Sequence, residues 1–517
     1  MKKTKKIFAV LLAAVLTLCV FGGAFTAFAA APDYAVIYLR GSTDIYKYNS
    51  DGTKYTLYGN GDYLSAVMNN MSLLLTGSYD AYAYRVLSIM KPAYDPFRPS
   101  LEDGSVPGDT HVENVWSRAS IVRAKKSNCF EYFMDDRLSP FVLADDLHDF
   151  INTVKDVTGK SKIFFYARCL GPVLLFTYLY KYERPNDYSD LKGVMLSFST
   201  HEGMAISDAM FTGNVNITSA ALDSWMDDQS VISVSGSAGS LIMFLMDNVV
   251  GGLGSGVSAS TLNRYYGKLK YNLFKPLLKE YYALRLSYMA CVNERFDEMM
   301  GYLFSDEGDD VKYSYAISQM RAYHNNVYPV INDMLSEIKE QGKNVIIFAD
   351  YGGQQYPVSE ESEYLGDFRV GTKAQSIGAT VSKVNGTLTR SYIESRKSKG
   401  LGSYISADAK VDASTCRFPD NTFFVSNVNH TWTDKYKAAE LKLIDRAGFD
   451  INSDSSIPQF LFWDEDAGKL VPLSDVAPHS DGSDDAPSQG SGGFFSRIIA
   501  FITGVFARIR DFFVRLF

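Results

Sequence analysis

Residues 162–172 constrain the fold of this chain more than any other stretch. They read Lys-Ile-Phe-Phe-Tyr-Ala-Arg-Cys-Leu-Gly-Pro. The run Ile163–Ala167 is too short for a helix and is rich in aromatic and β-branched side chains, which predicts a buried strand. Pro172 and the apolar residues that follow it predict a helix, since proline is well tolerated in a first helical turn. Cys169 therefore lies in a sharp turn between a strand and a helix.

This layout resembles the nucleophile elbow of α/β-hydrolases. In that motif, small residues two positions before and after the nucleophile let a strained turn pass close to its neighbours. The common pattern is G-x-S-x-G, and here Ala167 and Gly171 flank Cys169, so cysteine replaces serine. The same local sequence also fits a buried, unreactive thiol, because cysteine is among the residues most often buried.

The N-terminus has the pattern of a secretory signal peptide. A basic start, MKKTKK, precedes an apolar run and the small residues Ala27-Phe28-Ala29. We therefore expect residues 1–29 to be removed and the protein to be secreted. A net charge of −8 gives no electrostatic basis for binding nucleic acid.

The cysteines and histidines suggest neither a zinc site nor a disulfide-rich scaffold, since they are scattered and form no CxxC or HExxH motif. We expect no metal and no cofactor. Cys129 is predicted to begin a strand beside the one that Cys169 ends, too far along it for a disulfide bond. Bonds from Cys169 to Cys291 or Cys416 stay open at this point.

The first part of the chain alternates between strands and helices. Short apolar runs at 34–39, 128–133 and 191–198 predict strands, and residues 140–158 predict an amphipathic helix that ends at Gly159. Such alternation is typical of a parallel sheet with right-handed crossovers. Between the first two strands, residues 44–62 suggest a hairpin.

The alternation stops between residues 201 and 341, where the pattern is helical and rich in tyrosine, leucine and methionine. We interpret this stretch as a helical cap inserted into the sheet domain. The sheet resumes at 344–349, directly before Asp350, and residues 422–425 are predicted as its last strand, shortly before His430. His201 also follows a strand, but its position at the cap junction suggests a structural role.

Several motifs together resemble the lipase-like α/β-hydrolases that include lecithin:cholesterol acyltransferase and the inositol deacylases. The resemblance spans residues 34 to about 434 and includes four stretches besides the elbow: Leu39-Arg40-Gly41-Ser42, Tyr132–Arg137, Gly366-Asp367 followed by Val370, and Phe418-Pro419-Asp420 leading to His430. It implies an α/β-hydrolase fold with Asp367 as catalytic acid and His430 as base. The order nucleophile, acid, base along the chain agrees with this fold. Asp350 is the alternative acid.

The predicted site is chemically coherent. The amide of Leu170, with one from Gly41 or Ser42, would form an oxyanion hole. A helix N-terminus, the neighbouring Arg168 and His430 would each favour the thiolate of Cys169, which is the nucleophilic form.

The C-terminal part differs from the rest in composition. Residues 474–493 have the composition of a flexible acidic linker. Residues 494–517 form an amphipathic pattern whose polar stripe includes Arg497, Arg508 and Arg515. Because these arginines interrupt the apolar run, we predict a helix lying in the plane of an anionic membrane rather than a transmembrane span. A helix that folds back on the protein is the alternative.

These inferences divide the chain into a signal peptide (1–29), a first part of the α/β-hydrolase core (30–200), a helical cap (201–341), a second part of the core (342–473), a linker (474–493) and an amphipathic helix (494–517). The leading hypothesis is a secreted, membrane-associated enzyme that cleaves or transfers acyl groups of carboxylic esters, with lipid esters included. A non-catalytic surface protein that uses the fold for binding, and a thiol amidase or peptidase, are the alternatives.

Overall fold

The structure is a computed structural model of the 517-residue chain. It describes residues 32–41, 43–56, 69–227, 258–282, 290–428, 430, 437–438, 440–441, 444, 450–455, 457–477, 480 and 482. The predicted signal peptide, most of the linker and the predicted amphipathic helix lie outside these residues, and so do Arg497, Arg508 and Arg515. Within the described part, no helix is long and apolar enough to cross a membrane.

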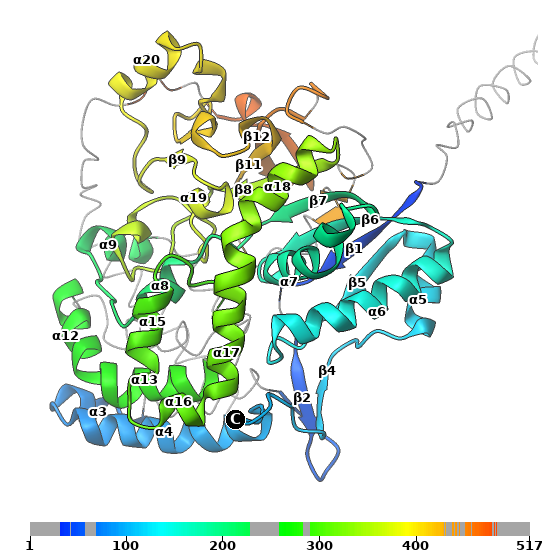
Figure 1. The fold of residues 1–517 in the computed structure, drawn as a ribbon. Coiled ribbons are helices and arrows are strands. Elements are labelled where there is room, and N and C mark those ends of the chain that lie inside the picture. Colours follow the sequence, from blue (N-terminus) through cyan, green and yellow to red (C-terminus); the bar gives the residue numbers. More distant parts are fainter. Residues whose placement is uncertain are drawn as a thin grey trace, which may run out of the picture.

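An eight-stranded sheet forms the centre of the molecule (Figure 1). Its spatial order is β13-β12-β11-β8-β7-β6-β1-β5. All neighbouring strands are parallel except β12 and β13, which are antiparallel, so the predicted mostly parallel sheet is confirmed. The strands are β1 (Tyr34–Leu39), β5 (Cys129–Tyr132), β6 (Lys162–Arg168), β7 (Leu191–Ser197), β8 (Asn344–Asp350), β11 (Thr422–Ser426), β12 (Phe460–Asp464) and β13 (Lys469–Pro472).

The central strands are hydrophobic along most of their length because helices and loops cover both faces of the sheet. Successive residues of β6 point to opposite faces, so Phe165 and Ala167 pack with helices α6 (Pro140–Thr158) and α7 (Gly171–Tyr178). Phe164 and Tyr166 instead join a second cluster that includes Ile444. The predicted helix at 140–158 is confirmed, with Gly159 left-handed just after it.

Helices form a second layer beside the sheet (Figure 1). Between β7 and β8, the described residues contain helices and no strands. Helix α4 (Tyr79–Tyr94) comes before β5 in sequence but packs against α12 of this layer. The helices between β7 and β8 are α8 (Ala205–Phe211), α9 (Ser219–Asp227), α12 (Ala259–Leu269), α13 (Lys275–Leu277), α15 (Phe296–Leu303), α16 (Asp309–Lys312), α17 (Ser314–Ala322) and α18 (Ile331–Glu340).

Two sequence predictions about the sheet are wrong. Residues 422–425 are not the last strand, because β12 and β13 follow and extend the edge beyond β11. These two strands were missed since each is a short apolar run inside a polar stretch. Cys129 is not on a strand next to that of Cys169, because β1 lies between β5 and β6.

Smaller sheets lie outside the central one. The predicted hairpin is present as β2 (Ile45–Tyr48) and β3 (Lys54–Thr56), and it gains a third strand, β4 (Thr110–Val112), that the sequence analysis did not predict. Strands β9 (Thr380–Val381) and β10 (Val411–Asp412) form a separate pair near helix α20 (Arg390–Ser398). Neither sheet contributes a strand to the carboxyl edge of the central sheet.

Candidate active site

Cys169 lies at the tip of a tight turn between β6 and α7. Its φ of +55° is in the left-handed region, which a non-glycine residue adopts only at a cost. Gly171 permits the turn, because a Cβ at this position would lie 2.4 Å from the carbonyl oxygen of Leu39 on the adjacent strand. The buried Ala167 likewise packs closely before the turn. This geometry is that of an elbow which raises one side chain above the edge of the sheet.

Hydrogen bonds to the next strand hold this elbow in place. The Cys169 amide donates to the Ser197 carbonyl at 3.2 Å. The Cys169 carbonyl in turn accepts from the Thr200 amide at 3.2 Å and from the Thr200 hydroxyl at 2.9 Å. Since every one of these partners belongs to β7 or to the residues directly after it, the position of the sulfur depends on that strand.

His430, from the residues that follow β11, reaches the sulfur of Cys169. Its Nε2 lies 2.9 Å from Sγ, and its Nδ1 lies 2.7 Å from Oδ2 of Asp367. The His430 amide also donates to the Asp367 carbonyl at 3.2 Å. The structure thus brings together the cysteine, histidine and aspartate that the sequence analysis selected as nucleophile, base and acid.

The loop that carries Asp367 is shaped to orient its carboxylate. Oδ1 accepts the backbone amides of Arg369 at 3.0 Å and Val370 at 2.7 Å, which leaves Oδ2 for His430. Phe368 adopts a φ of +76° so that the chain can fold back around the carboxylate. Gln375 then ties the loop to the sheet, since it accepts the Asp350 amide at 2.9 Å and donates to the Val370 carbonyl at 3.0 Å.

Electrostatics favour a thiolate and an imidazolium at this site. Burial opposes the charged form of Cys169, but the charge and hydrogen bond of His430, together with Arg369, lower the pKa of the thiol below its usual value. Burial also opposes charging His430, yet the neighbouring Asp367 and Cys169 raise the pKa of the imidazole to about 9. Because the two groups interact directly, they titrate as one pair, and both shifts favour the thiolate–imidazolium form.

The cation beside the sulfur is not the one predicted. Arg168 is almost completely buried; it stacks over Phe198, with Cζ 4.3 Å from the ring centre, and lies 3.9 Å from the carboxylate of Glu440. Arg168 continues the alternation of β6, so its side chain lies on the face of Phe164 and Tyr166, where Phe198 also packs. Arg369 supplies the positive charge instead. Sequence reasoning missed it, although it lies inside the Gly-Asp-x-x-Val motif.

The alternative acid and the second histidine have other surroundings. Asp350 is buried at the end of β8, where its Oδ1 accepts the Gly352 amide at 2.9 Å, and burial followed by the charge of Asp367 raises its pKa well above the usual range. It is not the carboxylate that contacts His430. His201 is completely buried after β7, and burial lowers its pKa to about 3. The interpretation of His201 as structural agrees with this environment.

The predicted oxyanion turn lies against the elbow. A Cβ on Gly41 would come within 2.3 Å of the Cys169 Cβ and 3.0 Å of its Sγ, so only glycine fits here. The Leu170 amide follows the sulfur at the start of α7 and donates no hydrogen bond among the described residues. Ser42 lies outside the described residues.

The remaining predictions concern cysteines and metals. Cys129, Cys169, Cys291 and Cys416 are not disulfide-bonded. Among the residues that the structure describes, no group of three histidine, cysteine, aspartate or glutamate side chains is arranged to hold a metal ion. We therefore build the chemistry of the site on Cys169, His430 and Asp367. No protein-family model matches the chain, and no curated protein matches it.

Proposed function

We propose that this chain is an α/β-hydrolase-fold enzyme that cleaves or transfers acyl groups of carboxylic esters, with Cys169 as nucleophile, His430 as base and Asp367 as orienting acid. The observation that carries the proposal is the continuous line of short contacts from Sγ through the imidazole to the carboxylate, at 2.9 and 2.7 Å. The sequence resemblance to the lecithin:cholesterol acyltransferase and inositol deacylase group supports the same reaction class.

The first half of the reaction acylates the cysteine. The Cys169 thiolate attacks the ester carbonyl carbon, a C–S bond forms, and the carbonyl oxygen becomes an oxyanion that the Leu170 amide and the Gly41 turn would stabilise. When the C–O bond breaks, the leaving alkoxide takes the proton that His430 holds on Nε2. The products of this half are an alcohol, a thioester on Cys169 and a neutral imidazole.

The second half releases the acyl group. Nε2 of His430 accepts a proton from a water molecule or an acceptor alcohol, whose oxygen attacks the thioester carbon. The C–S bond breaks and the electron pair returns to sulfur, so the thiolate–imidazolium pair is restored. Asp367 keeps the Nδ1 proton in place throughout and stabilises the imidazolium.

We also propose that the enzyme is secreted and acts at a membrane surface. The N-terminal pattern supports secretion, and the amphipathic pattern of residues 494–517 supports attachment to an anionic membrane surface, where lipid esters are available.

A second candidate function is a thiol amidase or peptidase. The observation that favours it is the short contact between Sγ of Cys169 and Nε2 of His430, a pairing that thiol enzymes that cleave amide bonds also use.

One experiment compares these functions directly. Mature protein and its Cys169→Ala, Cys169→Ser and Cys129→Ala variants would be assayed on p-nitrophenyl esters of several chain lengths and on p-nitroanilides, with intact-mass detection of an acyl adduct. We expect ester hydrolysis and a mass increase in the native protein and in Cys129→Ala, which is the matched control. Anilide cleavage that exceeds ester cleavage would favour the amidase. No adduct and no turnover with either substrate would favour the binding protein.

A further inference from the structure

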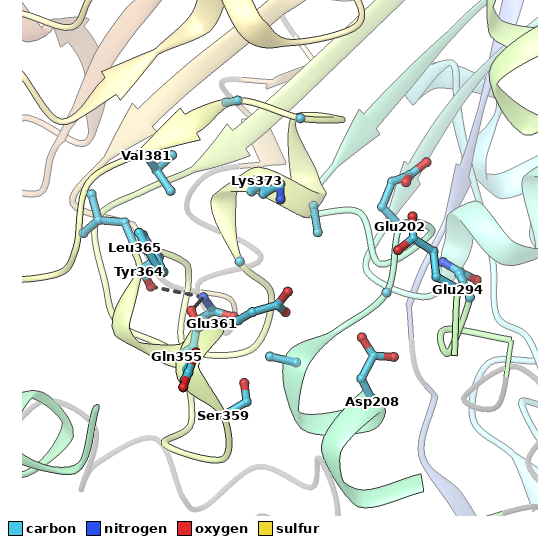
Figure 2. A pocket seen from close by; sticks show the side chains of 18 of the residues that line it. Glu202, Asp208, Glu294, Gln355, Ser359, Glu361, Tyr364, Leu365, Lys373 and Val381 are labelled. Atoms are coloured by element: carbon cyan, nitrogen blue, oxygen red, sulfur yellow. Dashed lines mark hydrogen bonds between the residues drawn. The ribbon is translucent and has the colours of Figure 1, made fainter. Parts of the chain in front are cut away.

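A cavity of about 840 Å³ lies beside the candidate active site (Figure 2). Its walls come from the β7–α8 connection, from cap residues 293–295 and from the loops after β8. None of Cys169, His430 and Asp367 lines the cavity. Its lining residues are, however, close in the chain to residues that hold these side chains in place, or pair with them. Thr200, which bonds the Cys169 carbonyl, is two residues before the lining residue Glu202, and the lining residue Gln355 pairs with Phe368 of the acid loop.

Two buried amide side chains line the cavity with fixed orientations. Gln355 is 5% exposed, and its Nε2 donates to the carbonyls of Glu361 at 3.0 Å and Tyr364 at 3.1 Å. Asn293 is 3% exposed, and its Nδ2 donates to the carbonyl of His201. Among the described residues, Gln355 Oε1 and Asn293 Oδ1 accept no hydrogen bond. Both side chains thus have an acceptor left for a ligand.

Carboxylates provide further acceptors on two walls of the cavity. Glu202, Glu294 and Asp208 lie on one side, and Glu361 lies on the other (Figure 2). Oδ1 of Asp208 is buried without a hydrogen-bond partner in the described structure. Burial, and then the nearby Glu361, raise the pKa of Asp208 to about 7. A buried acidic oxygen among like charges is stabilised most by a positively charged donor.

Among the described residues no cation forms an ion pair with Asp208, although the charge of Arg295 acts to lower the pKa of this carboxyl. Arg295 lines the wall but forms an ion pair with Glu298 at 2.7 Å. Lys373 is exposed and sits on a separate wall, and Glu360 adds a further carboxylate at the exposed side. The described residues also hold no arrangement of three ligating side chains suited to a metal ion. This favours an organic cation over a metal.

Part of the cavity wall is apolar. The buried side chains of Leu365, Ile377 and Val381 line it. Leu365 and Val381 lie across the cavity from Asp208 (Figure 2). A ligand that suits both walls has an alkyl chain of a few carbons and ends in a group rich in hydrogen-bond donors. A protonated amine meets both requirements, because an ammonium group has three donors and no acceptor.

We propose that this cavity binds a protonated alkylamine and that it receives the amine-bearing part of the substrate acted on at Cys169. The second half of this inference rests on the proposed function. Asp208 and Asn293 would accept hydrogen bonds from the ammonium group, while Glu202 and Glu294 would supply further negative charge. Binding of the amine by itself requires no catalysis.

The first test measures binding in the full-length Cys169→Ala protein, so that no turnover occurs. Isothermal titration at pH 8 would compare pentylamine with 1-pentanol and pentanoate, which match its chain but lack the positive charge. We expect pentylamine to bind at least about tenfold more tightly than either. Asp208→Asn and Glu202→Gln should each weaken the amine about tenfold, whereas Glu340→Gln, an exposed acid at the end of α18, is the control. Equal binding of pentanol, or unchanged amine binding in both acidic-wall variants, would overturn the inference.

The second test connects the cavity to the reaction. With Cys169 intact, kcat/KM for p-nitrophenyl 6-aminohexanoate should exceed that for p-nitrophenyl hexanoate about tenfold, and Asp208→Asn should reduce this preference. If the protein binds pentylamine but hydrolyses neither ester, the cavity stands and the proposed function fails. If it hydrolyses both esters equally well, the link between cavity and substrate fails while the proposed function stands.

Discussion

Thr200 lies between two cysteine–histidine pairs, Cys169 with His430 and Cys291 with His201. The pKa values of the two pairs are shifted in opposite directions. The Thr200 hydroxyl donates to the carbonyl of Cys169 at 2.9 Å and accepts from Sγ of Cys291 at 3.3 Å. Burial raises the pKa of Cys291 to about 12 and lowers that of the neighbouring His201 to about 3. In the other region, the pKa of Cys169 is lowered and that of His430 is raised to about 9.

Burial does not explain this difference, since His201 and His430 are both at least nine-tenths buried. What differs is the set of partners. His430 has a carboxylate on Nδ1 at 2.7 Å and a thiol on Nε2. Nδ1 of His201 instead pairs with the uncharged Ser199 hydroxyl, and its Nε2 makes no hydrogen bond within the described part of the chain and lies 3.7 Å from the Glu202 carboxylate. The comparison shows that the charges next to a buried group decide whether its neutral or its charged form is favoured.

The largest expected contrast is between the two histidines. His430→Gln should lower kcat/KM for a p-nitrophenyl ester by at least about 10³-fold, because it removes the base and the imidazolium. His201→Gln should stay within about threefold per folded molecule while lowering the melting temperature, since it disturbs only buried packing. Steady-state kinetics, corrected for the folded fraction by circular dichroism, checks both. A loss of activity in folded His201→Gln as large as that in His430→Gln would break the comparison.

The two cysteines should differ in how alkylation depends on pH. Because the pKa of Cys169 is lowered, a larger fraction of it is thiolate at pH 6 than of an ordinary thiol with a pKa near 8.5. We expect iodoacetamide to label Cys169 about 10²-fold faster than a cysteine-containing peptide at pH 6.

Cys291 provides the opposite reference, since its pKa is raised and it is buried. It should stay unlabelled in the native protein up to pH 9. Peptide mass spectrometry after timed labelling would resolve the two sites. A Cys169 rate that rises tenfold per pH unit between pH 6 and 8, as for an ordinary thiol, would contradict the ion pair.

A third test compares Asp367, whose carboxylate contacts His430, with Asp350 at the end of β8. Asp367→Asn should lower kcat/KM by about 10²-fold or more, because an amide on Nδ1 neither stabilises the imidazolium nor keeps the correct tautomer. Asp350→Asn should change it by less than about threefold, since Asp350 does not contact His430 and its surroundings disfavour its charged form. The pH dependence of alkylation should shift toward that of a normal thiol only in Asp367→Asn. Equal losses in both variants would reinstate Asp350 as the acid.

The smallest expected effect concerns the turn that lies against the elbow. Gly41→Ala places a methyl group where the Cys169 side chain now lies, so the sulfur or the turn must move. We expect a loss of about 10- to 10²-fold in kcat with little change in KM, as for a disturbed oxyanion hole. Gly108→Ala is a matched control, because a Cβ there meets no atom within 4 Å. A Gly41→Ala enzyme with native kcat would remove this turn from the site.

Much of the fold could be predicted from local patterns. The strand, turn and helix around Cys169 were predictable because a short apolar run, a small residue and a proline each act over a few residues. The strands β12 and β13 were missed because Phe460–Asp464 and Lys469–Pro472 are short apolar runs inside a polar stretch. Pairing of β12 with β11, and of β13 with β12, stabilises them, and pairing is not visible in a local window.

The amino-acid sequence by itself determined the residue types of the site, their order along the chain and the elbow that carries Cys169. Only the tertiary structure decided which charges meet there. Arg168 is adjacent to Cys169 in sequence yet faces Glu440, while Arg369, 200 positions away, reaches the sulfur's surroundings. The reason is physical. Electrostatic interactions depend on distance and burial in space, and a strand sends neighbouring side chains to opposite faces while a sheet brings distant loops to one edge.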